Sequence, residues 1–364
     1  MKLGITLAGL LALIVIPSGA HAGAMAYHVT DLGLLAGSTY NEARGINVSG
    51  QVIGASYFTP VLTHATLWNG TTATDLGTLG GTSSLAWAVN ASGQVVGEHS
   101  FADSTTRAVL WNGTTATDLG TLGGRDSYAK GINASGQVVG SSNIANGPLH
   151  AVRWNGTTPT DLGTLGGSSS LGAGINASGQ VVGRADLTGD SAYHATLWNG
   201  TTATDLGTLG GTHSLAFAIN DSGQAVGWSF AAGSNLQHAA LWNGTTVIDL
   251  GALGDFTSAL GINASGQIVG SFSKGFTSHA FLYTDGTMYD LLSLLEPGSG
   301  VTDLYMSGYG AINDLGQIAV NGTIGGRGHA LRLDPVAVPE PSSTLLLLGS
   351  GWMWMFPRHR GLRR

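Results

Sequence analysis

The sequence contains no cysteine, so it can form neither disulfide bonds nor metal sites built on thiolates. Charge is also scarce, because only 10% of the 364 residues are charged, against about 25% in an ordinary soluble domain. Glycine, by contrast, occurs 59 times, and 43% of the residues are hydrophobic. This composition predicts a chain of many turns and uncharged strands, with enough apolar side chains to fill a core.

The chain begins with MKLGITLAGLLALIVIPSGAHA, which has the layout of a secretory signal peptide over residues 1–22. Lys2 supplies a basic start, an apolar run follows, and small residues precede a cleavage point after Ala22. The apolar run is shorter than the roughly 20 residues that a membrane-spanning helix needs. We therefore expect export with cleavage after Ala22, and Ala26 is the alternative site.

The end of the chain, residues 336–364, departs from everything before it. The motif Val338, Pro339, Glu340 and Pro341 precedes a short apolar stretch and then four arginines. Prolines interrupt regular structure, and arginines stay on the cytoplasmic side while an apolar segment enters a bilayer. We therefore expect a short transmembrane segment that makes transient contact with the inner membrane.

This tail closely resembles the PEP-CTERM sorting signal in its three-part layout, over the last 27 residues. The resemblance implies recognition by an exosortase in a Gram-negative bacterium that makes exopolysaccharide. It also implies removal of the tail and a mature protein that is extracellular or displayed on the cell surface. The WMWMF run at 352–356 departs from the Leu/Ala/Gly-rich segment that is usual in such tails.

The region between these two segments is acidic. Without Lys2, the four C-terminal arginines and Glu340, it keeps 9 basic and 20 acidic residues, a net charge of −11. Binding to nucleic acid needs a basic surface that neutralises phosphates. The sequence therefore predicts that nucleic acid is not a partner.

Residues 26–335 contain one unit seven times, with a period of 43 or 44 residues that lengthens only in the last interval. The phrase LWNGTTATDLGTLGG recurs without change at 67–81, 110–124 and 197–211. Another phrase, GINASGQVVG, and its variants place glutamine at one point of every unit: Gln51, Gln94, Gln137, Gln180, Gln224, Gln267 and Gln317. Self-similarity at this period is typical of propellers and solenoids.

Each unit has the pattern of four short strands, called A to D here in chain order. SLAWAVN and QVVGEHS are joined by a tight turn at Asn90, and RAVLW and TATDLGTL are joined by Asn112 and Gly113. Four antiparallel strands in about 43 residues match one blade of a β-propeller, and an open solenoid is the alternative.

The ends of the repeat region favour a closed ring. The region starts with AYHVTDLG as a lone D strand and finishes with GHALRLDP as a C strand that lacks its D strand. These ends complete one another, whereas an open stack prefers whole polar repeats as caps. We therefore predict an all-β fold, a seven-bladed β-propeller of four-stranded blades over 26–335, with the ring closed by the N-terminal strand.

One phrase of the repeat carries a family likeness. HAFLY at His279, HATLW twice, HAALW, HAVRW and HALRL closely resemble the HAF-repeat family of extracellular bacterial repeat proteins. The likeness covers roughly residues 26–335. It implies secretion and repetition, because the family has no general activity to transfer.

Six histidines at one repeat position and seven aspartates at another raise the question of metal binding. Equivalent positions on different blades lie around a rim, whereas ligands of one ion lie about 2 Å from it. We therefore expect a buried hydrogen bond from each histidine to the aspartate of a nearby D strand. Asp186 and Asp190 offer two calcium ligands on one loop, fewer than a recognised calcium loop has. No metal, cofactor or catalytic residue is predicted.

Twelve Asn-x-Ser/Thr triplets match the acceptor pattern for N-glycosylation. They lie at hairpin turns of the repeat or in its last unit, where the backbone favours asparagine. We interpret them as turn residues.

Ligand-binding residues are expected where the units differ. The B-to-C loops vary and share one face of a propeller with the D-to-A loops, which fits either a binding face or unequal drift of surface loops. The innermost strand also varies two residues before each IN or VN, at Arg44, Trp87, Lys130, Ala173, Phe217, Leu260 and Gly310. If these side chains point into the channel, two cations and two aromatics suit a sugar; if they point between blades, they fill the core.

Three functions remain open. The first is a secreted or surface-displayed non-catalytic module of an exopolysaccharide or biofilm matrix, or of adhesion, that binds an extracellular glycan. Its candidate ligand-binding residues are Glu42, Arg44, Trp87, Asp126, Lys130 and Phe217. The second is a polysaccharide-active hydrolase or lyase, for which Glu42 and Asp126 would enter one face from different D-to-A loops. The third is a purely structural extracellular protein.

Overall fold

The computed structural model describes residues 25–59, 61–234 and 236–336. Tyr27–Pro335 form one compact unit, in which 28 strands are joined by turns and one short 3-10 helix, η1 (Leu291–Leu294). The described residues contain no α-helix, and none of their helices has the length and apolar character needed to cross a membrane. The all-β class is therefore confirmed. The predicted signal peptide, its cleavage point and the motif at 338–341 lie outside the described residues.

Four-stranded antiparallel sheets follow one another along the chain. The first comprises β2 (Tyr40–Ile46), β3 (Val52–Thr59), β4 (Leu62–Asn69) and β5 (Thr72–Asp75). The second comprises β6 (Ser83–Val89), β7 (Val95–Ser100), β8 (Thr106–Asn112) and β9 (Thr115–Asp118). The third comprises β10 (Gly123–Ile132), β11 (Gln137–Ile144), β12 (Leu149–Asn155) and β13 (Thr158–Asp161). The fourth comprises β14 (Gly166–Ile175), β15 (Val181–Leu187), β16 (Tyr193–Asn199) and β17 (Thr202–Asp205).

The next eight strands form a single hydrogen-bonded sheet. One half comprises β18 (Gly210–Ile219), β19 (Gln224–Ala231), β20 (Gln237–Asn243) and β21 (Thr246–Gly251). The other comprises β22 (Phe256–Ile262), β23 (Ile268–Lys274), β24 (Thr277–Thr284) and β25 (Thr287–Asp290). One parallel residue pair, Gln237 with Phe256, links the two halves. Counted by hydrogen bonding, the described chain therefore has six sheets, five of four strands and one of eight.

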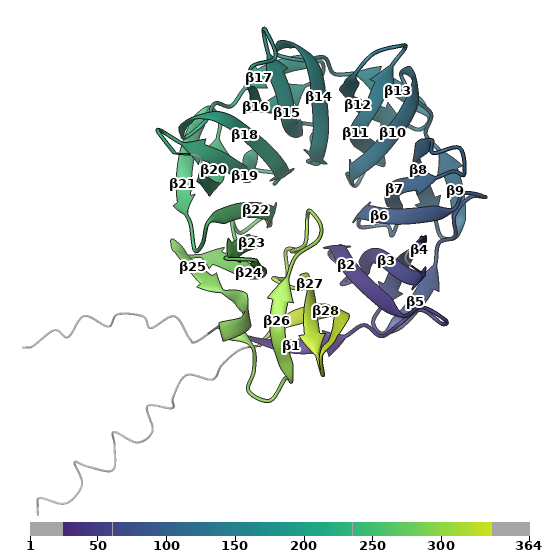
Figure 1. The fold of residues 1–364 in the computed structure, drawn as a ribbon, viewed down its shortest axis with the longest axis vertical. Coiled ribbons are helices and arrows are strands. Elements are labelled where there is room, and N and C mark those ends of the chain that lie inside the picture. Colours follow the sequence, from purple (N-terminus) through teal and green to yellow (C-terminus); the bar gives the residue numbers. More distant parts are fainter. Residues whose placement is uncertain (1–24, 60, 235, 337–364) are drawn as a thin grey trace, which may run out of the picture. The chain divides into compact units, whose positions relative to one another are not determined.

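The remaining four-stranded sheet joins the two ends of the unit. Its strands are, in spatial order, β1 (Ala26–Asp31), β28 (Arg327–Val336), β27 (Ile318–Ile324) and β26 (Val301–Tyr305). The backbone N–H of Leu32, just after β1, donates to the carbonyl of Ala330 at 3.1 Å. Figure 1 shows the sheets standing side by side around a common centre, with β1 next to β28. The N-terminal strand therefore takes the place of the missing D strand.

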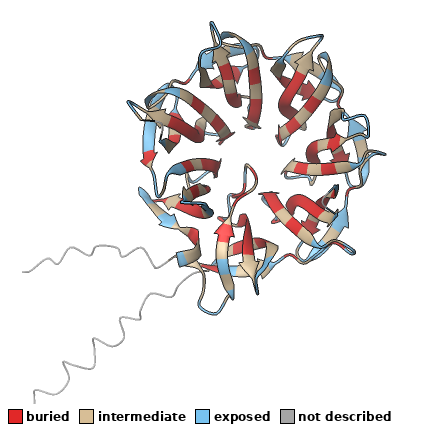
Figure 2. Cartoon of the chain, in the orientation of Figure 1, coloured by how far each residue is buried: buried red, intermediate tan, exposed pale blue. Residues whose placement is uncertain are grey.

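Tight turns connect the strands as the glycine pattern predicts. In the second sheet Asn112 faces Thr115 across a two-residue turn, and Gly113 has φ +59°, a backbone conformation that other residues rarely adopt. The outer fourth strands are short and largely exposed, whereas the second strands, such as β3 and β7, are mostly buried, and Figure 2 shows this burial. The outer hairpins therefore form the rim of the unit.

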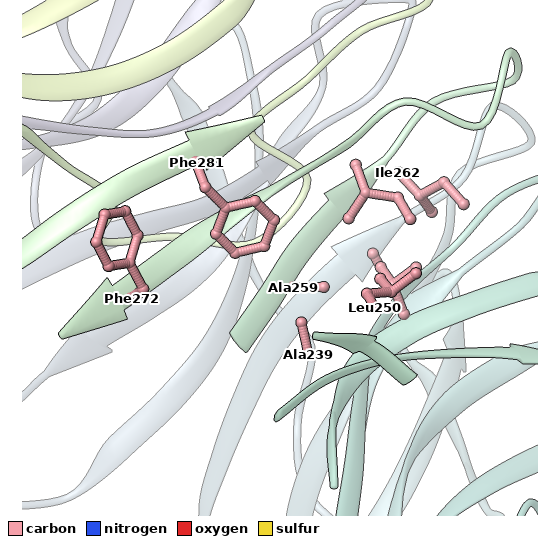
Figure 3. Packing of buried hydrophobic residues seen from close by; sticks show 9 residues of the cluster. Ala239, Leu250, Ala259, Ile262, Phe272 and Phe281 are labelled. Carbon is pink, nitrogen blue, oxygen red and sulfur yellow. The ribbon is translucent and has the colours of Figure 1, made fainter. Parts of the chain in front are cut away.

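The hydrophobic core lies between neighbouring sheets. One cluster combines Leu250 and Ala239 from one half of the eight-stranded sheet with Ile262, Phe272 and Phe281 from the other (Figure 3). Each sheet of this kind needs a neighbour to cover its apolar face. The largest completely buried side chains are five tryptophans at one repeat position: Trp68, Trp111, Trp154, Trp198 and Trp242.

A closed cycle of asparagine hydrogen bonds surrounds the centre at the A-to-B turns. The side-chain amide of Asn47 donates to the backbone carbonyl of Asn90 at 3.0 Å, and each following asparagine does the same. Asn313 completes the cycle by donating to the carbonyl of Asn47 at 2.9 Å. The seven members are Asn47, Asn90, Asn133, Asn176, Asn220, Asn263 and Asn313. These asparagines hold their own turns, as predicted, and also link successive sheets.

The histidine–aspartate pairs form at the rim. His64 lies 2.8 Å from Asp75, and the same contact joins His329 of β28 to Asp31 of β1. Pairing is confirmed within most units, but the prediction that the pairs are buried is wrong, because the aspartate side chains are about two-fifths exposed. His279 departs from the pattern and lies 3.4 Å from Asp303, since the aspartate of its own unit caps η1.

Candidate functional site

Six of the innermost strands have a β-bulge at the variable position two residues before IN or VN, and β26 does not, because its register with β27 shifts between Val301 and Asp303. In β6 the register with β7 shifts between Ala86 and Ala88, so Trp87 has no partner residue. The same shift occurs at Arg44, Lys130, Ala173, Phe217 and Leu260. A bulge re-aims the side chain of the extra residue. Gly97 of β7 allows the bulge, because a Cβ there would collide with the carbonyl oxygen of Leu85.

Four of these bulged side chains meet at the centre of the unit. The Arg44 guanidinium carbon lies 4.3 Å from the centre of the Trp87 ring, and the Lys130 ammonium lies 3.6 Å from it. Phe217 stacks on Tyr309 at 4.5 Å, and Tyr309 stacks on Trp87 at 6.0 Å. These residues come from four different sheets and one loop, so they point toward the common axis. The channel interpretation is therefore confirmed, and the alternative that they fill the core between blades is wrong.

Tyr309 is the member that sequence reasoning missed. It lies in the loop between β26 and β27, which reaches the centre of the ring in Figure 1. The alignment of units placed Gly310 at this position, and the backbone N–H of Gly310 donates to the carbonyl of Leu260 at 3.0 Å. Burial raises the pKa of the Tyr309 hydroxyl, so it stays protonated at neutral pH.

Glu42 accepts hydrogen bonds from several groups beside this stack. Its carboxylate lies 3.1 Å from Arg44 Nη2 and 3.1 Å from the hydroxyls of both Tyr40 and Tyr57. The Tyr40 hydroxyl also lies 2.6 Å from that of Tyr305. Burial is the main cause that raises the pKa of all three tyrosines, and the Glu42 charge adds to it. The three hydroxyls therefore act as donors at neutral pH.

A second acidic residue, Glu98 of β7, balances Lys130. The ammonium lies 3.1 Å from the Glu98 carboxylate, and both side chains are mostly buried. Burial lowers the pKa of Lys130, and the attraction of Glu98 partly opposes this change. We call Glu42, Arg44, Trp87, Glu98, Lys130, Phe217 and Tyr309 the central cluster. Its two cations and two carboxylates cancel in charge.

One charged hydrogen-bond donor of the central cluster has no acceptor within the described residues. Arg44 is only 8% exposed, and its Nε makes no hydrogen bond within the described residues. Trp87 Nε1 is likewise buried without a partner there. The core tryptophans such as Trp111 also leave Nε1 unpaired, so the indole alone is not distinctive. A buried guanidinium N–H without an acceptor is energetically costly. Arg44 Nε is therefore a donor to which a ligand could supply the missing acceptor.

Asp126 is not part of this cluster. It lies in β10 and accepts a hydrogen bond from the backbone N–H of Thr106 at 2.9 Å, across the joint to the second sheet. Glu42 and Asp126 both lie in innermost strands, so their placement in D-to-A loops is wrong. Because the strands begin earlier than the repeat pattern indicates, the two carboxylates serve different neighbours.

A cavity of about 150 Å³ lies on the axis next to the cluster. Lys130, Phe217 and Tyr309 contribute to its lining, and the remaining lining comes from the ends of innermost strands near the asparagine cycle, including Ile46 and Ile132. The centre is therefore only partly filled by the clustered side chains.

Metal ligands are not gathered in the described part of the chain, where no three His, Cys, Asp or Glu side chains come together. The Asp190 carboxylate instead accepts a hydrogen bond from the backbone N–H of Ser168 at 2.6 Å. It therefore fastens the variable loop between β15 and β16 to the innermost strand of its own sheet, β14.

No model of a known protein family matches this chain, and no curated protein sequence matches it. Among solved structures, it is similar to the β-propeller domain of the Trilobed protease from Pyrococcus furiosus, with 7% identity and a TM-score of 0.54 over 83% of this chain and 99% of that chain. It is also similar to a prolyl endopeptidase, with 12% identity and a TM-score of 0.50, and the match covers 85% of this chain and 50% of that one. TolB from Acinetobacter baumannii matches with 13% identity and a TM-score of 0.48 over 79% of this chain and 64% of that one. At these identities the similarity concerns the fold, so the chain has a β-propeller fold of four-stranded sheets.

Proposed function

We propose that Tyr27–Pro335 is a seven-bladed propeller whose last blade is completed by β1. The asparagine cycle supports this count, because seven successive side chains return to the first member. The eight-stranded sheet counts as two blades in this proposal, since a single residue pair links its halves. The contact of His329 with Asp31 supports closure by the N-terminal strand.

We further propose that this propeller is a secreted or surface-displayed, non-catalytic module that binds an extracellular glycan at the central cluster, within an exopolysaccharide matrix or in adhesion. The observation that carries the proposal is the buried, unpaired Nε of Arg44. A sugar oxygen can accept from it, and the rings of Trp87, Phe217 and Tyr309 offer apolar surface to a sugar face.

A polysaccharide hydrolase or lyase is less well supported. A hydrolase of the usual kind needs two carboxylates on either side of one bond, whereas Glu42 and Glu98 are each ion-paired with a cation and Asp126 bonds to a backbone group away from Glu42. A tyrosine base of a lyase would need a lowered pKa, and the pKa values of Tyr40, Tyr57 and Tyr305 are raised.

The proposal includes the export, processing and extracellular location of the protein. Residues 1–22 direct export and are removed after Ala22, and an exosortase recognises the motif Val338 to Pro341 and removes the tail. The HAF-like repeats agree with an extracellular location. A protein displayed in many copies would gain affinity by multivalent binding.

The test is affinity electrophoresis of the full-length protein in gels that contain the polysaccharides of its host. Arg44→Lys keeps a cation beside Glu42 but removes Nε and the planar fork, so we expect retention to weaken about tenfold. Arg153→Lys makes the same change in β12, outside the cluster, and should leave retention unaltered.

Two outcomes would overturn the proposal. Release of reducing sugar that disappears in Glu42→Gln would establish the enzyme instead. If no polysaccharide changes the migration of either wild type or Arg44→Lys, the protein binds none of them, and the purely structural function is supported instead.

A further inference from the structure

A second group of aromatic and charged side chains lies at the joint between the fourth sheet and β18–β21. We call it the joint cluster, and it comprises Arg184, Asp186, Tyr193, His213, Trp228 and Phe230. Its members belong to β15, β16, β18 and β19. It lies where the variable loops join the strands, because Tyr193 starts β16 directly after the B-to-C loop.

Three of the four ring pairs in the joint cluster are arranged edge to face, and the pair of Trp228 with Phe230 is tilted at 54°. Tyr193 lies 4.4 Å from His213 at 67° and 6.2 Å from Trp228 at 86°. Phe230 lies 5.1 Å from Trp228 and 6.0 Å from His213. The guanidinium of Arg184 covers one side of Tyr193 at 4.0 Å. Side chains of two neighbouring sheets therefore share one aromatic surface, in which Trp228 is buried and the other three rings are partly exposed.

Packing of the repeat does not require these residues. Other units have Thr63 or Thr106 where this joint has Tyr193, and Ser83 or Ser169 where it has His213. Those joints are held by the same serine-to-backbone bond, such as Ser84 Oγ with the N–H of Ala65 at 2.8 Å, that Ser214 and Ala195 make here. The cluster is thus an addition to a joint that is already complete.

The polar atoms of the cluster are placed to meet a ligand. Within the described residues, neither the Arg184 guanidinium nor the Tyr193 hydroxyl makes a hydrogen bond or ion pair. His213 uses Nδ1 for a contact of 2.8 Å with Thr212 Oγ1, which leaves Nε2. The Asp186 carboxylate offers acceptors beside these donors.

Charge at the joint cluster disfavours an acidic sugar. Burial lowers the pKa of His213 and so keeps it neutral at neutral pH. Asp190 adds its charge to that of Asp186, which leaves two carboxylates against the single cation Arg184. A uronate or sulfate group would meet net repulsion here.

We propose that the joint cluster binds one neutral pyranose unit of a glycan, with its apolar face on the aromatic rings and its hydroxyls on Arg184 and Asp186. This inference rests on the proposed glycan-binding function and adds a second site with a stated sugar class. Aromatic surface combined with one donor and one acceptor group is the pattern that suits an uncharged sugar.

The test uses residues that other units already contain, so that folding is preserved. The full-length double variant Tyr193→Thr/His213→Ser is compared with wild type and with Thr106→Ala at the joint between the second and third sheets. Retention is measured in gels that contain dextran, mannan or galactan as neutral polymers and alginate as the acidic one. Loss of the aromatic surface should weaken retention on at least one neutral polymer about tenfold, with Thr106→Ala unchanged.

Equal retention of the double variant and wild type on every neutral polymer would refute the joint site while leaving the central cluster untouched. Weakening confined to alginate would refute the neutral sugar class. If Arg44→Lys loses retention and the double variant keeps it, only the proposal of this second site fails. If wild type is retained by none of the polymers tested, including the host's own, both the joint site and the proposed glycan-binding function are refuted.

Discussion

At the residue scale, the turn asparagines do more than their turns require. In the third sheet the Asn133 carboxamide oxygen accepts from Gln137 N–H, and its NH₂ group donates to Gln137 Oε1 and to the carbonyl of Asn176. One buried side chain thus fixes its own turn and also the next sheet. Aspartate could accept in the turn but could not donate to the neighbour.

We therefore expect Asn133→Ala to lower the free energy of unfolding by about 2–4 kcal/mol, since several buried hydrogen bonds are lost at once. Asn112→Ala is the control, because this exposed asparagine lies in an outer hairpin and makes no side-chain hydrogen bond within the described residues. Urea denaturation of both variants measures the difference. A cost for Asn133→Ala no greater than that of the control would show that the cycle adds nothing to stability.

Tyr27 of β1 gives a prediction about pH. Its side chain is completely buried, its hydroxyl has no partner in the described residues, and burial raises its pKa to about 12. The unfolded tyrosine ionises near its ordinary value, so the unfolded state releases a proton first as pH rises. Stability is therefore complete below about pH 10 and declines between about pH 10 and 12.

Tyr27→Phe should make this decline shallower, because it removes one of the groups that cause it. Denaturation midpoints at about pH 8 and about pH 11 test the expectation in both proteins. At the lower pH the variant should be as stable as wild type or slightly more stable, since an unpaired buried hydroxyl is lost. An identical pH dependence in both proteins would contradict the assigned shift.

At the element scale, the repeat predicted most strands well, because turn signals and alternation recur with the same spacing. Hairpins such as that at Asn112 follow from local sequence alone, and the pairing of the first strand with the last follows from the point in the repeat at which the region starts and ends. The last unit could not be predicted in the same way. Its aspartate, Asp290, caps η1 in place of pairing with His279, and the longer loop then carries Tyr309 to the axis.

The candidate site likewise contains residues that the repeat predicted and residues that it did not. Repeat alignment identified Arg44, Trp87, Lys130 and Phe217 as one position, and the structure brings them together. Repeat alignment could not identify Glu98, because this residue forms its ion pair with Lys130 from the second strand of a neighbouring unit. Glu98 and Tyr309 lie outside the repeat position that relates Arg44, Trp87 and Lys130, so the repeat period does not reveal their contacts.

The pairing of β1 with β28 leads to a prediction about thermal stability. A chain that begins at Gly37 would leave the edge of β28 unpaired and remove the contact of His329 with Asp31. We expect a fall in Tm of about 10 °C or more, together with aggregation through the open edge. Thermal melting and size-exclusion chromatography are compared with a chain that begins at Tyr27. Equal melting of the two chains would contradict the proposed closed ring.

At the scale of the whole molecule, the proposed processing predicts a definite mass. Protein recovered from the surface of its native host should lack residues 1–22 and the chain beyond the motif at 338–341. Replacing Pro339 and Glu340 with alanine should leave the tail attached, because the motif that the exosortase would recognise is lost. Intact-mass spectrometry reads both outcomes, and surface protein that still carries Arg364 would rule the processing out.

The asparagine cycle has a consequence for how the gene can change. Stretches of fifteen identical residues at 67–81, 110–124 and 197–211 imply similar DNA, which invites unequal recombination that adds or deletes one unit. In a linear array such an event would only alter the length. Here the amide of Asn313 must reach the carbonyl of Asn47, and six or eight units would have to meet at a different angle to complete the circuit. If the chain is the proposed seven-bladed ring, gain or loss of one unit would therefore break this circuit, although the copies themselves are nearly interchangeable.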